Sequence, residues 1–202
     1  MQRSPVIDDV PQEKIQVSPV GVLCILREDE TAFYTVVTVD PTARTVTALP
    51  LTDNEIDEIY RKDGAAVLRD RLQEKGEQVD FYVDVTFEQM REWLQYLGNG
   101  VGVTLQENIT YTDTAGLVVS FPAGTLTLSA NQTADMLRAV EPLPTAAQTV
   151  ANVWAGIVRR YTTQDRNFTA DYTALTDIGE TDIHIYDFQK ALPHLEKMTE
   201  EK

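Results

Sequence analysis

The stretch from Val79 to Leu97 constrains the possible fold more than any other part of this chain. A run with strand composition, VDFYVDV, passes directly into the helical pattern TFEQMREWLQYLG. Thr86 and Gln89 have the spacing of a capping box at the start of that pattern, and Gly98 stands where a helix C-cap belongs. Apolar residues mark one helical stripe: Phe87, Met90, Leu94 and Leu97. A strand joined without a loop to an amphipathic helix is typical of layered α/β domains.

Strand-like and helix-like segments alternate along most of the chain. Strands are expected at Pro19–Arg27, Thr31–Asp40, Arg44–Leu51, Val101–Leu105 and Asp182–Tyr186, with shorter strand-like runs between Asn108 and Leu128. Helices are expected at Asp53–Gly76 with a break at Asp63-Gly64, from Ser129 to about Val140, from Thr145 to about Arg160, as a short turn after residues 162–167, and from Phe188 to Met198.

This alternation predicts a single domain of the α/β class. A central mixed sheet is expected to carry helices on both faces, which gives three layers, α/β/α. We expect the domain to cover residues 18–200. Residues 1–17 are mostly polar and contain two prolines, so they are interpreted as a flexible leader or linker.

The charge of the chain excludes two classes of partner. It has 32 Asp and Glu against 17 Lys and Arg, which gives a formal net charge of −15. Nucleic-acid binding needs a basic face that displaces counterions from phosphates, and docking on an anionic membrane needs basic residues as well. The hydrophobic content of 43% predicts a globular domain with a core and argues against disorder.

The single cysteine excludes an intramolecular disulfide. Cys24 lies in the apolar run VLCIL, so we expect a buried thiol and not a reactive one. The chain shows neither a signal peptide nor a run of about 18 apolar residues, which a membrane-spanning helix needs. If the natural protein is anchored in a membrane, the anchor is expected upstream of Met1.

No short catalytic or nucleotide-binding motif occurs in the sequence. It lacks a P-loop, G-x-G-x-x-G, H-E-x-x-H, C-x-x-C and G-x-S-x-G. His184 and His194 are both expected at the surface, without a partner that would make either a catalytic base. Asp80, Asp84 and Asp113 are interpreted as isolated carboxylates.

The acidic cluster around Asp53 has two interpretations. Asp53 and Asp57 are four residues apart and would share a helix face, as metal ligands can. Carboxylates also favour the first turn of a helix, where the helix dipole stabilises them. The second interpretation is preferred.

The order of these segments resembles the LytR-CpsA-Psr domain family. VTVDPTARTVTALPL is similar to its strand–turn–strand pattern S-I-N-P-x-T-x-x-V-x-L-L-S-I-P. VDFYVDVTFEQMREWLQYLGNGVGVTL resembles I-D-Y-Y-V-x-V-D-F-x-G-F-x-x-L-V-D-x-L-G-G-V-x-V, which is the most specific part. FPAGTLTLSANQTADMLRAVE resembles F-x-A-G-x-x-x-L-D-G-x-Q-A-L-x-Y-A-R. The resemblance covers Pro19 to Met198, mostly at apolar and turn positions.

The resemblance implies a location and a reaction. Members are membrane-anchored proteins of mainly Gram-positive bacteria, with the domain outside the cell. They transfer an anionic glycopolymer from a polyprenyl-pyrophosphate carrier to peptidoglycan. An apolar tunnel takes the lipid, and arginines and aspartates at its mouth hold the pyrophosphate and a magnesium ion. Such a site neutralises charge that develops on phosphate oxygens.

The charged positions of the family pattern are mostly replaced in this chain. Glu30 and Ala32 stand where the family has the Arg and the Asp of an R-x-D-T element, and the loop is shorter. The Arg of I-P-R-D-T corresponds to Leu51 or Asp53, depending on one gap. Acidic or neutral residues therefore occupy positions that would hold a pyrophosphate.

One arginine of the pattern is retained. The first Arg of L-x-Y-A-R-x-R matches Arg138, whereas the second falls on Val140. Of R-x-x-R-Q only the Gln remains, as Gln148. Each lost charged partner costs a few kcal/mol of transition-state stabilisation, so the loss of several predicts the loss of the reaction.

Three functional hypotheses remain open at the level of sequence. The preferred one is a non-catalytic member at the outer face of a bacterial envelope, with a polyprenyl-linked lipid, a cell-wall glycan or an envelope protein as partner. The second is a working transferase with a rebuilt site, in which Arg138 acts with Arg27 or Arg61, and Asp29 or Asp53 binds Mg²⁺. The third is an intracellular regulatory or assembly domain. The candidate ligand-binding residues are Arg138, Gln148 and Arg27, and no cofactor is expected outside the transferase hypothesis.

Overall fold

The computed structural model describes residues 18–98, 100–112, 115–161 and 168–187. Five strands form a central sheet in the order β3-β2-β1-β4-β9. Their bounds are Val20–Glu28 for β1, Thr31–Asp40 for β2, Thr45–Leu51 for β3, Phe81–Thr86 for β4 and Glu180–Thr181 for β9. β1 pairs with β2 in the antiparallel sense and with β4 in the parallel sense, so the sheet is mixed as expected.

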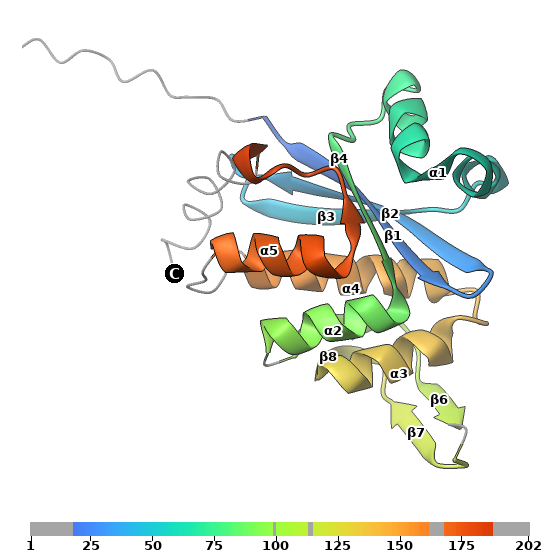
Figure 1. The fold of residues 1–202 in the computed structure, drawn as a ribbon. Helices are drawn as coiled ribbons and strands as arrows, with labels where there is room; N and C mark the ends of the chain where they lie inside the picture. The colour runs from blue at the N-terminus through green and yellow to red at the C-terminus, as the bar shows by residue number, and fades with distance from the viewer. Residues whose placement is uncertain (1–17, 99, 113–114, 162–167, 188–202) are drawn as a thin grey trace, which may run out of the picture.

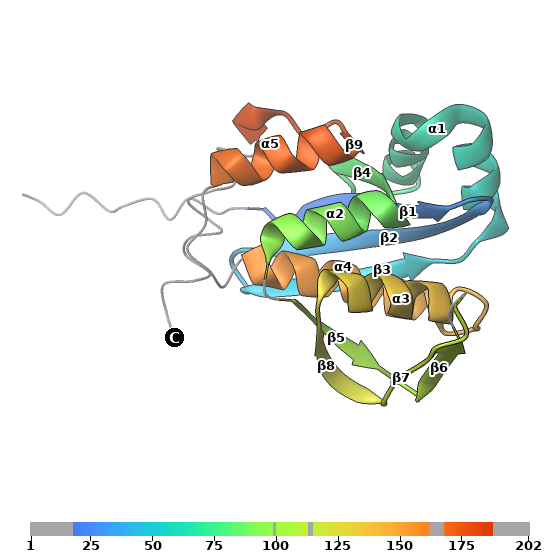
Figure 2. The same ribbon diagram turned by 60° about the horizontal axis from the view of Figure 1, so that its bottom comes forward.

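Helices cover both faces of this sheet (Figures 1 and 2). Helix α1, Asn54–Glu74, packs on one face. The other face is covered by α2 at Phe87–Leu97, α4 at Ala146–Tyr161 and α5 at Phe168–Ile178, and α3 at Ala130–Val140 packs against α2 and α4. The predicted α/β/α arrangement is thereby confirmed. The leader and the expected last helix, Phe188–Met198, lie outside the described residues.

Two small sheets lie on the side of α2, α3 and α4. β5, Val101–Leu105, pairs with β8, Gly124–Leu128, and β6, Ile109–Thr112, pairs with β7, Val118–Phe121. Both pairs are antiparallel. The β6–β7 hairpin projects beyond α3 (Figure 1).

The core lies on both sides of β1. Leu23 and Ile25 belong to the cluster under α1, and Cys24 and Leu26 to the cluster under α2 and α4. Successive side chains of a strand point to opposite faces, so an uninterrupted apolar run is what a strand between two helical layers requires. The Cys24 thiol is buried as expected, and burial raises its pKa well above the usual value.

Local capping signals set the starts of two helices. Thr86 accepts from the N–H of Gln89, and the side chain of Gln89 accepts from the N–H of Thr86, which completes the predicted capping box of α2. Ser129 and Gln132 form the same pair at α3. The expected break in α1 occurs at Gly64, whose φ of 85° and ψ of 179° are not helical.

Two expectations near the C-terminal end are wrong. The short turn after residues 162–167 is the 11-residue helix α5, and Asp182–Tyr186 is not a strand. Strand β9 ends at Thr181 because the next residue pairs through its side chain: Oδ1 of Asp182 accepts the N–H of Tyr82 at 2.7 Å. A carboxylate thus takes the place that a backbone carbonyl would occupy in a longer ladder.

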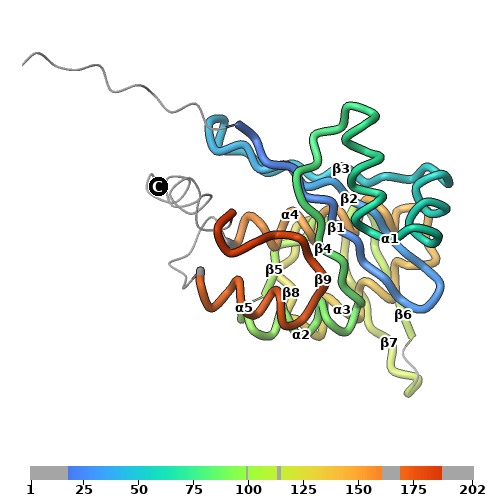
Figure 3. Tube along the Cα trace, turned by 45° about the horizontal axis from the view of Figure 1, so that its top comes forward, coloured from blue at the N-terminus to red at the C-terminus, as the bar shows by residue number. Residues whose placement is uncertain are grey.

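The segment around β9 connects two layers. The hydroxyl of Thr181 donates to the carbonyl of Tyr82 at 2.6 Å, and Asp182 forms an ion pair with Arg69 of α1. Figure 3 shows the chain passing from α5 into β9, which lies beside β4. Residues 181 and 182 therefore bind both β4 of the central sheet and helix α1.

No helix within the described ranges is long and apolar enough to cross a membrane. Arg159 and Arg160 lie in the last turn of α4, and Arg160 donates to the carbonyls of Leu97 and Gly100. These bonds satisfy carbonyls at and just beyond the C-terminal end of α2, which a helix cannot satisfy itself.

Gly156 allows α4 to contact β5 closely, and its replacement tests this packing. A Cβ at Gly156 would lie 2.3 Å from the carbonyl oxygen of Gly102, which is backbone and cannot rotate away. We expect Gly156→Ala to lower the free energy of unfolding by about 2 kcal/mol, measured by urea denaturation. Gly102→Ala is the matched control, because a Cβ there meets nothing within 4 Å. Equal stabilities of the two variants would contradict the close packing.

Candidate functional site

The carboxyl edge of the central sheet is the candidate site. We use this name for the edge at which β1, β3 and β4 end, at Glu28, Leu51 and Thr86. Open α/β sheets bind ligands outside the carboxyl ends of their parallel strands, and β1–β4 is the parallel pair of this sheet. Helix α2 begins directly after β4, so its positive end lies at the same edge.

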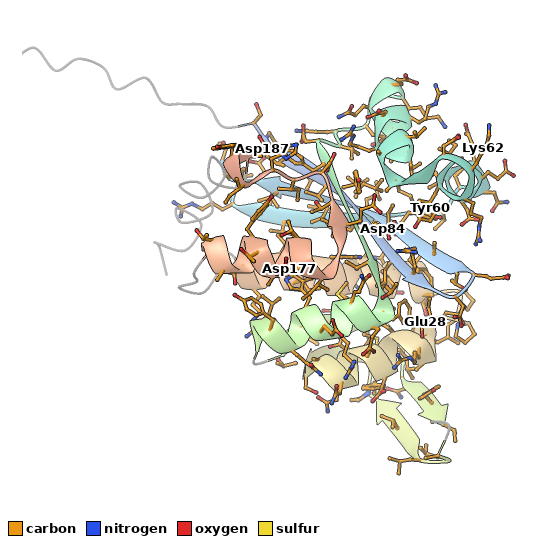
Figure 4. The ribbon with its side chains drawn as sticks, viewed as in Figure 1. Glu28, Tyr60, Lys62, Asp84, Asp177 and Asp187 are labelled. Carbon is orange, nitrogen blue, oxygen red and sulfur yellow. The ribbon has the colours of Figure 1, made fainter. Side chains whose placement is uncertain are left out.

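Asp84 is the most buried acidic group at this edge. Its side chain is 5% exposed, and it accepts from Nε of Arg27 at 2.6 Å and from the hydroxyl of Tyr60 at 2.7 Å. Tyr60 and Asp84 lie between α1 and the sheet (Figure 4). Arg27 therefore neutralises this carboxylate and Tyr60 donates a hydrogen bond to it, and both contacts offset the cost of burying its charge.

The pKa values of these partners follow from the same contacts. Burial raises the pKa of Tyr60, and the hydrogen bond to Asp84 raises it further. Burial opposes the charge of Arg27, but the attraction and hydrogen bond of Asp84 outweigh it, so the pKa of Arg27 is raised. Arg27 is a permanent cation at this edge, with 41% of its side chain exposed.

A second trio on the same face has the same chemistry but more solvent. Asp57 accepts from Nε of Arg61 at 2.5 Å and from the hydroxyl of Tyr34 at 2.8 Å. The bond from Arg61 is the main reason that the pKa of Asp57 is lowered. The side chain of Asp57 is 39% exposed. Arg61 also donates to the carbonyl of Glu30 and so connects α1 to the β1–β2 turn.

The opposite face of the edge carries a third pair. Nε of Arg138, on α3, donates to Oε1 of Glu28 at 3.3 Å. Glu28 lies toward α3, on the other side of the sheet from Tyr60 (Figure 4). Beside it, the hydroxyl of Thr31 donates to Glu141 at 2.8 Å.

The carboxyl edge is acidic in sum. Three arginines at this edge each have a carboxylate partner: Asp84 for Arg27, Asp57 for Arg61 and Glu28 for Arg138. Further carboxylates lie at the same edge, among them those of Asp29, Glu30 and Glu141. An incoming phosphate would therefore meet arginines that are already paired and a surplus of negative charge.

The structure brings two of the sequence candidates to the same edge and gives others local structural contacts. Arg27 and Arg138 lie at the same edge on opposite faces of the sheet. Asp29 lies in the turn between β1 and β2 with a φ of 49°. The side chain of Asp53 accepts the N–H of Glu55 at 3.0 Å, which is the helix-cap role preferred from sequence. Gln148, in the first turn of α4, donates to Asn152 at 3.3 Å.

The interpretation of Asp80 and Asp84 as isolated is wrong. Asp84 has the two partners described above, and Asp80 accepts the N–H of Gly21 at 2.8 Å. Sequence reasoning missed Tyr60 and Asp84 because their partners come from other elements. The alternation of Tyr82 and Asp84 with valines in β4 was the available signal that both share the face of α1.

The described carboxylates do not gather into a cluster of metal ligands. Within the ranges that the structure describes, no group of three or more His, Cys, Asp or Glu is placed to hold a metal ion. Asp29 and Asp53, the sequence candidates for a metal ligand, do not converge with other carboxylates into such a group. His184 is exposed as expected, and His194 lies outside the described residues.

The fold is similar to that of solved proteins with low sequence identity. A protein from Eubacterium siraeum DSM 15702, provisionally described as a transcription regulator, matches with a TM-score of 0.71 and 17% identity over 100% of this chain and 86% of its own. TagV of B. subtilis matches at 0.67 and 16% over 90% and 79%. TagT bound to LIIa-WTA matches at 0.65 and 16% over 88% and 74%. No family model and no curated protein sequence matches the chain. At these identities the likeness establishes the fold alone.

Asp84 and Asp57 form a matched pair for measuring what burial adds. Each accepts from one arginine Nε and one tyrosine hydroxyl, but only Asp84 is buried. We expect Asp84→Ala to lower the free energy of unfolding by about 2 kcal/mol, because it removes a buried carboxylate and leaves Nε of Arg27 and the half-buried hydroxyl of Tyr60 without their acceptor. Asp57→Ala should cost less than about 1 kcal/mol. Urea denaturation measures both, and a larger loss for Asp57→Ala would refute the ranking.

The tyrosines beneath α1 predict a loss of stability in alkali. Burial and the hydrogen bond to Glu180 raise the pKa of Tyr82 to about 12, and burial with carboxylate bonds raises those of Tyr34 and Tyr60 further. An unfolded tyrosine ionises near pH 10, so their contribution is complete below about pH 10 and is lost as the pH rises through the folded values.

Unfolding free energies measured between about pH 9 and 12 should therefore fall, and Tyr82→Phe should make the fall less steep. Tyr186→Phe is the control, since that side chain is 72% exposed and should not alter the slope. A slope that is the same in all three proteins would show that these tyrosines do not carry the effect.

Proposed function

We propose that this chain is a divergent LytR-CpsA-Psr domain that takes part in cell-wall assembly as a non-catalytic binding or structural member. Its place would be the outer face of the cytoplasmic membrane or the cell wall of a bacterium. The sequence resemblance from Pro19 to Met198 and the shared fold with TagV and TagT, which are proteins of that family, support this proposal. TagT has been solved with LIIa-WTA bound.

The observation that carries the non-catalytic assignment is the pairing of Arg27, Arg61 and Arg138 at the carboxyl edge. A transferase of this family needs cations that are free to bind a pyrophosphate as its charge develops. Here Arg27, Arg61 and Arg138 each donate their Nε to a carboxylate of the protein. Because a phosphate would compete with these carboxylates in an acidic surrounding, its binding is weakened before any chemistry begins.

One observation favours a second candidate, the active transferase with a rebuilt site. The arginines that this hypothesis names, Arg138 with Arg27 or Arg61, lie at one edge of the sheet, although they come from α3, β1 and α1. The guanidinium of Arg138 is bound through one long contact of 3.3 Å, which a ligand could replace. Magnesium would then have to enter with the phosphate, because the described carboxylates do not form a group that holds it.

The intracellular hypothesis has no structural observation in its favour. The provisional description of the E. siraeum protein concerns transcription regulation. With a net charge of −15, direct binding of DNA by this chain is disfavoured, because the phosphates would be repelled. A cell-wall glycan or an envelope protein is the partner that we propose, because a polyprenyl-linked phosphate would meet paired arginines in an acidic surrounding.

Calorimetry with a polyprenyl pyrophosphate tests the blocked site. The full chain is titrated with geranylgeranyl pyrophosphate in the presence of magnesium ions. We expect no binding by the unmodified chain and measurable binding by Glu28→Gln, which frees Arg138, with an affinity at least about tenfold higher. Glu74→Gln removes a carboxylate from an exposed ion pair with Arg71 and is the matched control, without effect.

The two candidates give opposite results in this experiment. Binding by the unmodified chain that disappears in Arg138→Ala would overturn the non-catalytic assignment and support the transferase. Cosedimentation of the chain with purified peptidoglycan, unchanged in Arg138→Ala, is the positive result expected of a non-catalytic wall protein. A chain that binds neither pyrophosphate nor peptidoglycan would contradict both candidates.

A further inference from the structure

The β6–β7 hairpin has an unusual combination of exposure and composition. Leu117 and Val118 are adjacent in its second arm and are 64% and 61% exposed. The segment from Ile109 to Leu128 contains one charged residue, Asp113, in a chain in which charged residues make up 24%. Projecting loops are normally polar, so an exposed apolar pair on an almost uncharged projection indicates contact with another molecule.

One face of the hairpin packs against the domain. Ile109 and Phe121 are 3% and 4% exposed and belong to the core cluster under α2 and α4, and Tyr111 and Val119 pack against the same cluster. The residues of β7 on the other face, Val118 and Ser120, are exposed. Among the described strands β7 pairs only with β6, so its outer edge is left without a strand partner.

The outer edge of β7 lacks the protection found at the edges of β3, β5 and β9. The edge strand β3 contains Pro50, and its Val46 carbonyl accepts a hydrogen bond from Arg159. The carbonyl of Thr104 in β5 accepts from Asn152, and β9 is two residues long. β7 reads VVSF, with neither charge nor proline, so nothing in its own sequence opposes pairing with another strand.

We infer that β7 is an association edge at which two copies of this chain pair antiparallel, joining their hairpins into one four-stranded sheet. A two-fold arrangement needs the same patch on both copies, and β7 supplies it. This inference does not rest on the proposed function.

Electrostatics favours a second copy over a cationic partner at this place. Two chains that each carry −15 repel one another over most of their surfaces, and the repulsion is smallest where charge is sparse. A basic partner would be selected by carboxylates, and β7 has none to offer. The apolar pair Leu117 and Val118 instead matches itself across the two-fold axis.

The dimer is expected to be weak and dependent on salt. Four residues from each copy bury less surface than the roughly 1,200 Å² of a stable interface, so we expect a dissociation constant near 0.1 mM, as an order of magnitude. Salt screens charge beyond about 10 Å, so higher ionic strength should strengthen the association. A contact driven by opposite charges would respond in the opposite direction.

Sedimentation equilibrium of the full chain tests the inference. With rising concentration up to about 1 mM, the average mass should rise from 22.6 kDa toward twice that value, and more steeply at high salt. Val118→Lys places a charge on the edge strand and should weaken association at least about tenfold. Val67→Lys is the matched control on α1, 37% exposed, and should associate like the unmodified chain.

A second variant and a second measurement make the result decisive. Leu117→Asp should also weaken association, and it serves if Val118→Lys fails to fold by circular dichroism. Backbone amides of 118–121 should exchange more slowly at high concentration. A mass that stays at 22.6 kDa at about 1 mM in high salt overturns the inference. Association that survives both hairpin variants, or amide exchange that does not change with concentration, overturns it as well.

Discussion

The burial of β1 on both faces is the constraint on which the rest of the structure depends. Leu23, Ile25 and Leu26 are completely buried, so one helical layer must cover each side of this strand. Polar side chains can stand in such a strand only at its ends. Arg27 and Glu28 close β1 and point to opposite faces, and each brings a partner to its own side. The position of the carboxyl edge as the candidate site thus follows from the packing of the strand that leads to it.

Much of the fold could be predicted because its signals are local. The alternating composition of the early strands and the pairs Thr86–Gln89 and Ser129–Gln132 act within a few residues. The end of β9 could not be predicted, because a carboxylate 100 residues from Tyr82 takes the place of a backbone partner. Arg27 could be named as a candidate from the sequence, whereas its contact with Asp84 could not, since the two are 57 residues apart and meet only when β1 and β4 pair.

The chain separates the determinants of a fold from those of a reaction. Apolar and turn positions resemble those of the LytR-CpsA-Psr pattern, and the fold is similar to that of TagV. Most positions that are charged in that pattern carry other residues here, and Arg27, Arg61 and Arg138 at the carboxyl edge are paired with carboxylates of the protein. Function resides in such sites and not in the fold that carries them. The net charge of −15 is thereby partly located at the place where an anionic substrate would bind.

The contacts of Thr181 and Asp182 have a consequence for the order of folding. They join residues that are 99 to 113 positions apart, because they connect Tyr82 in β4 and Arg69 in α1 to the segment that follows α5. Contacts of such long range close large loops and form slowly. During synthesis on the ribosome, the layer that contains α1 waits for residue 182 to emerge before its edge is complete. The face assembled from the earliest residues is therefore among the last to be finished.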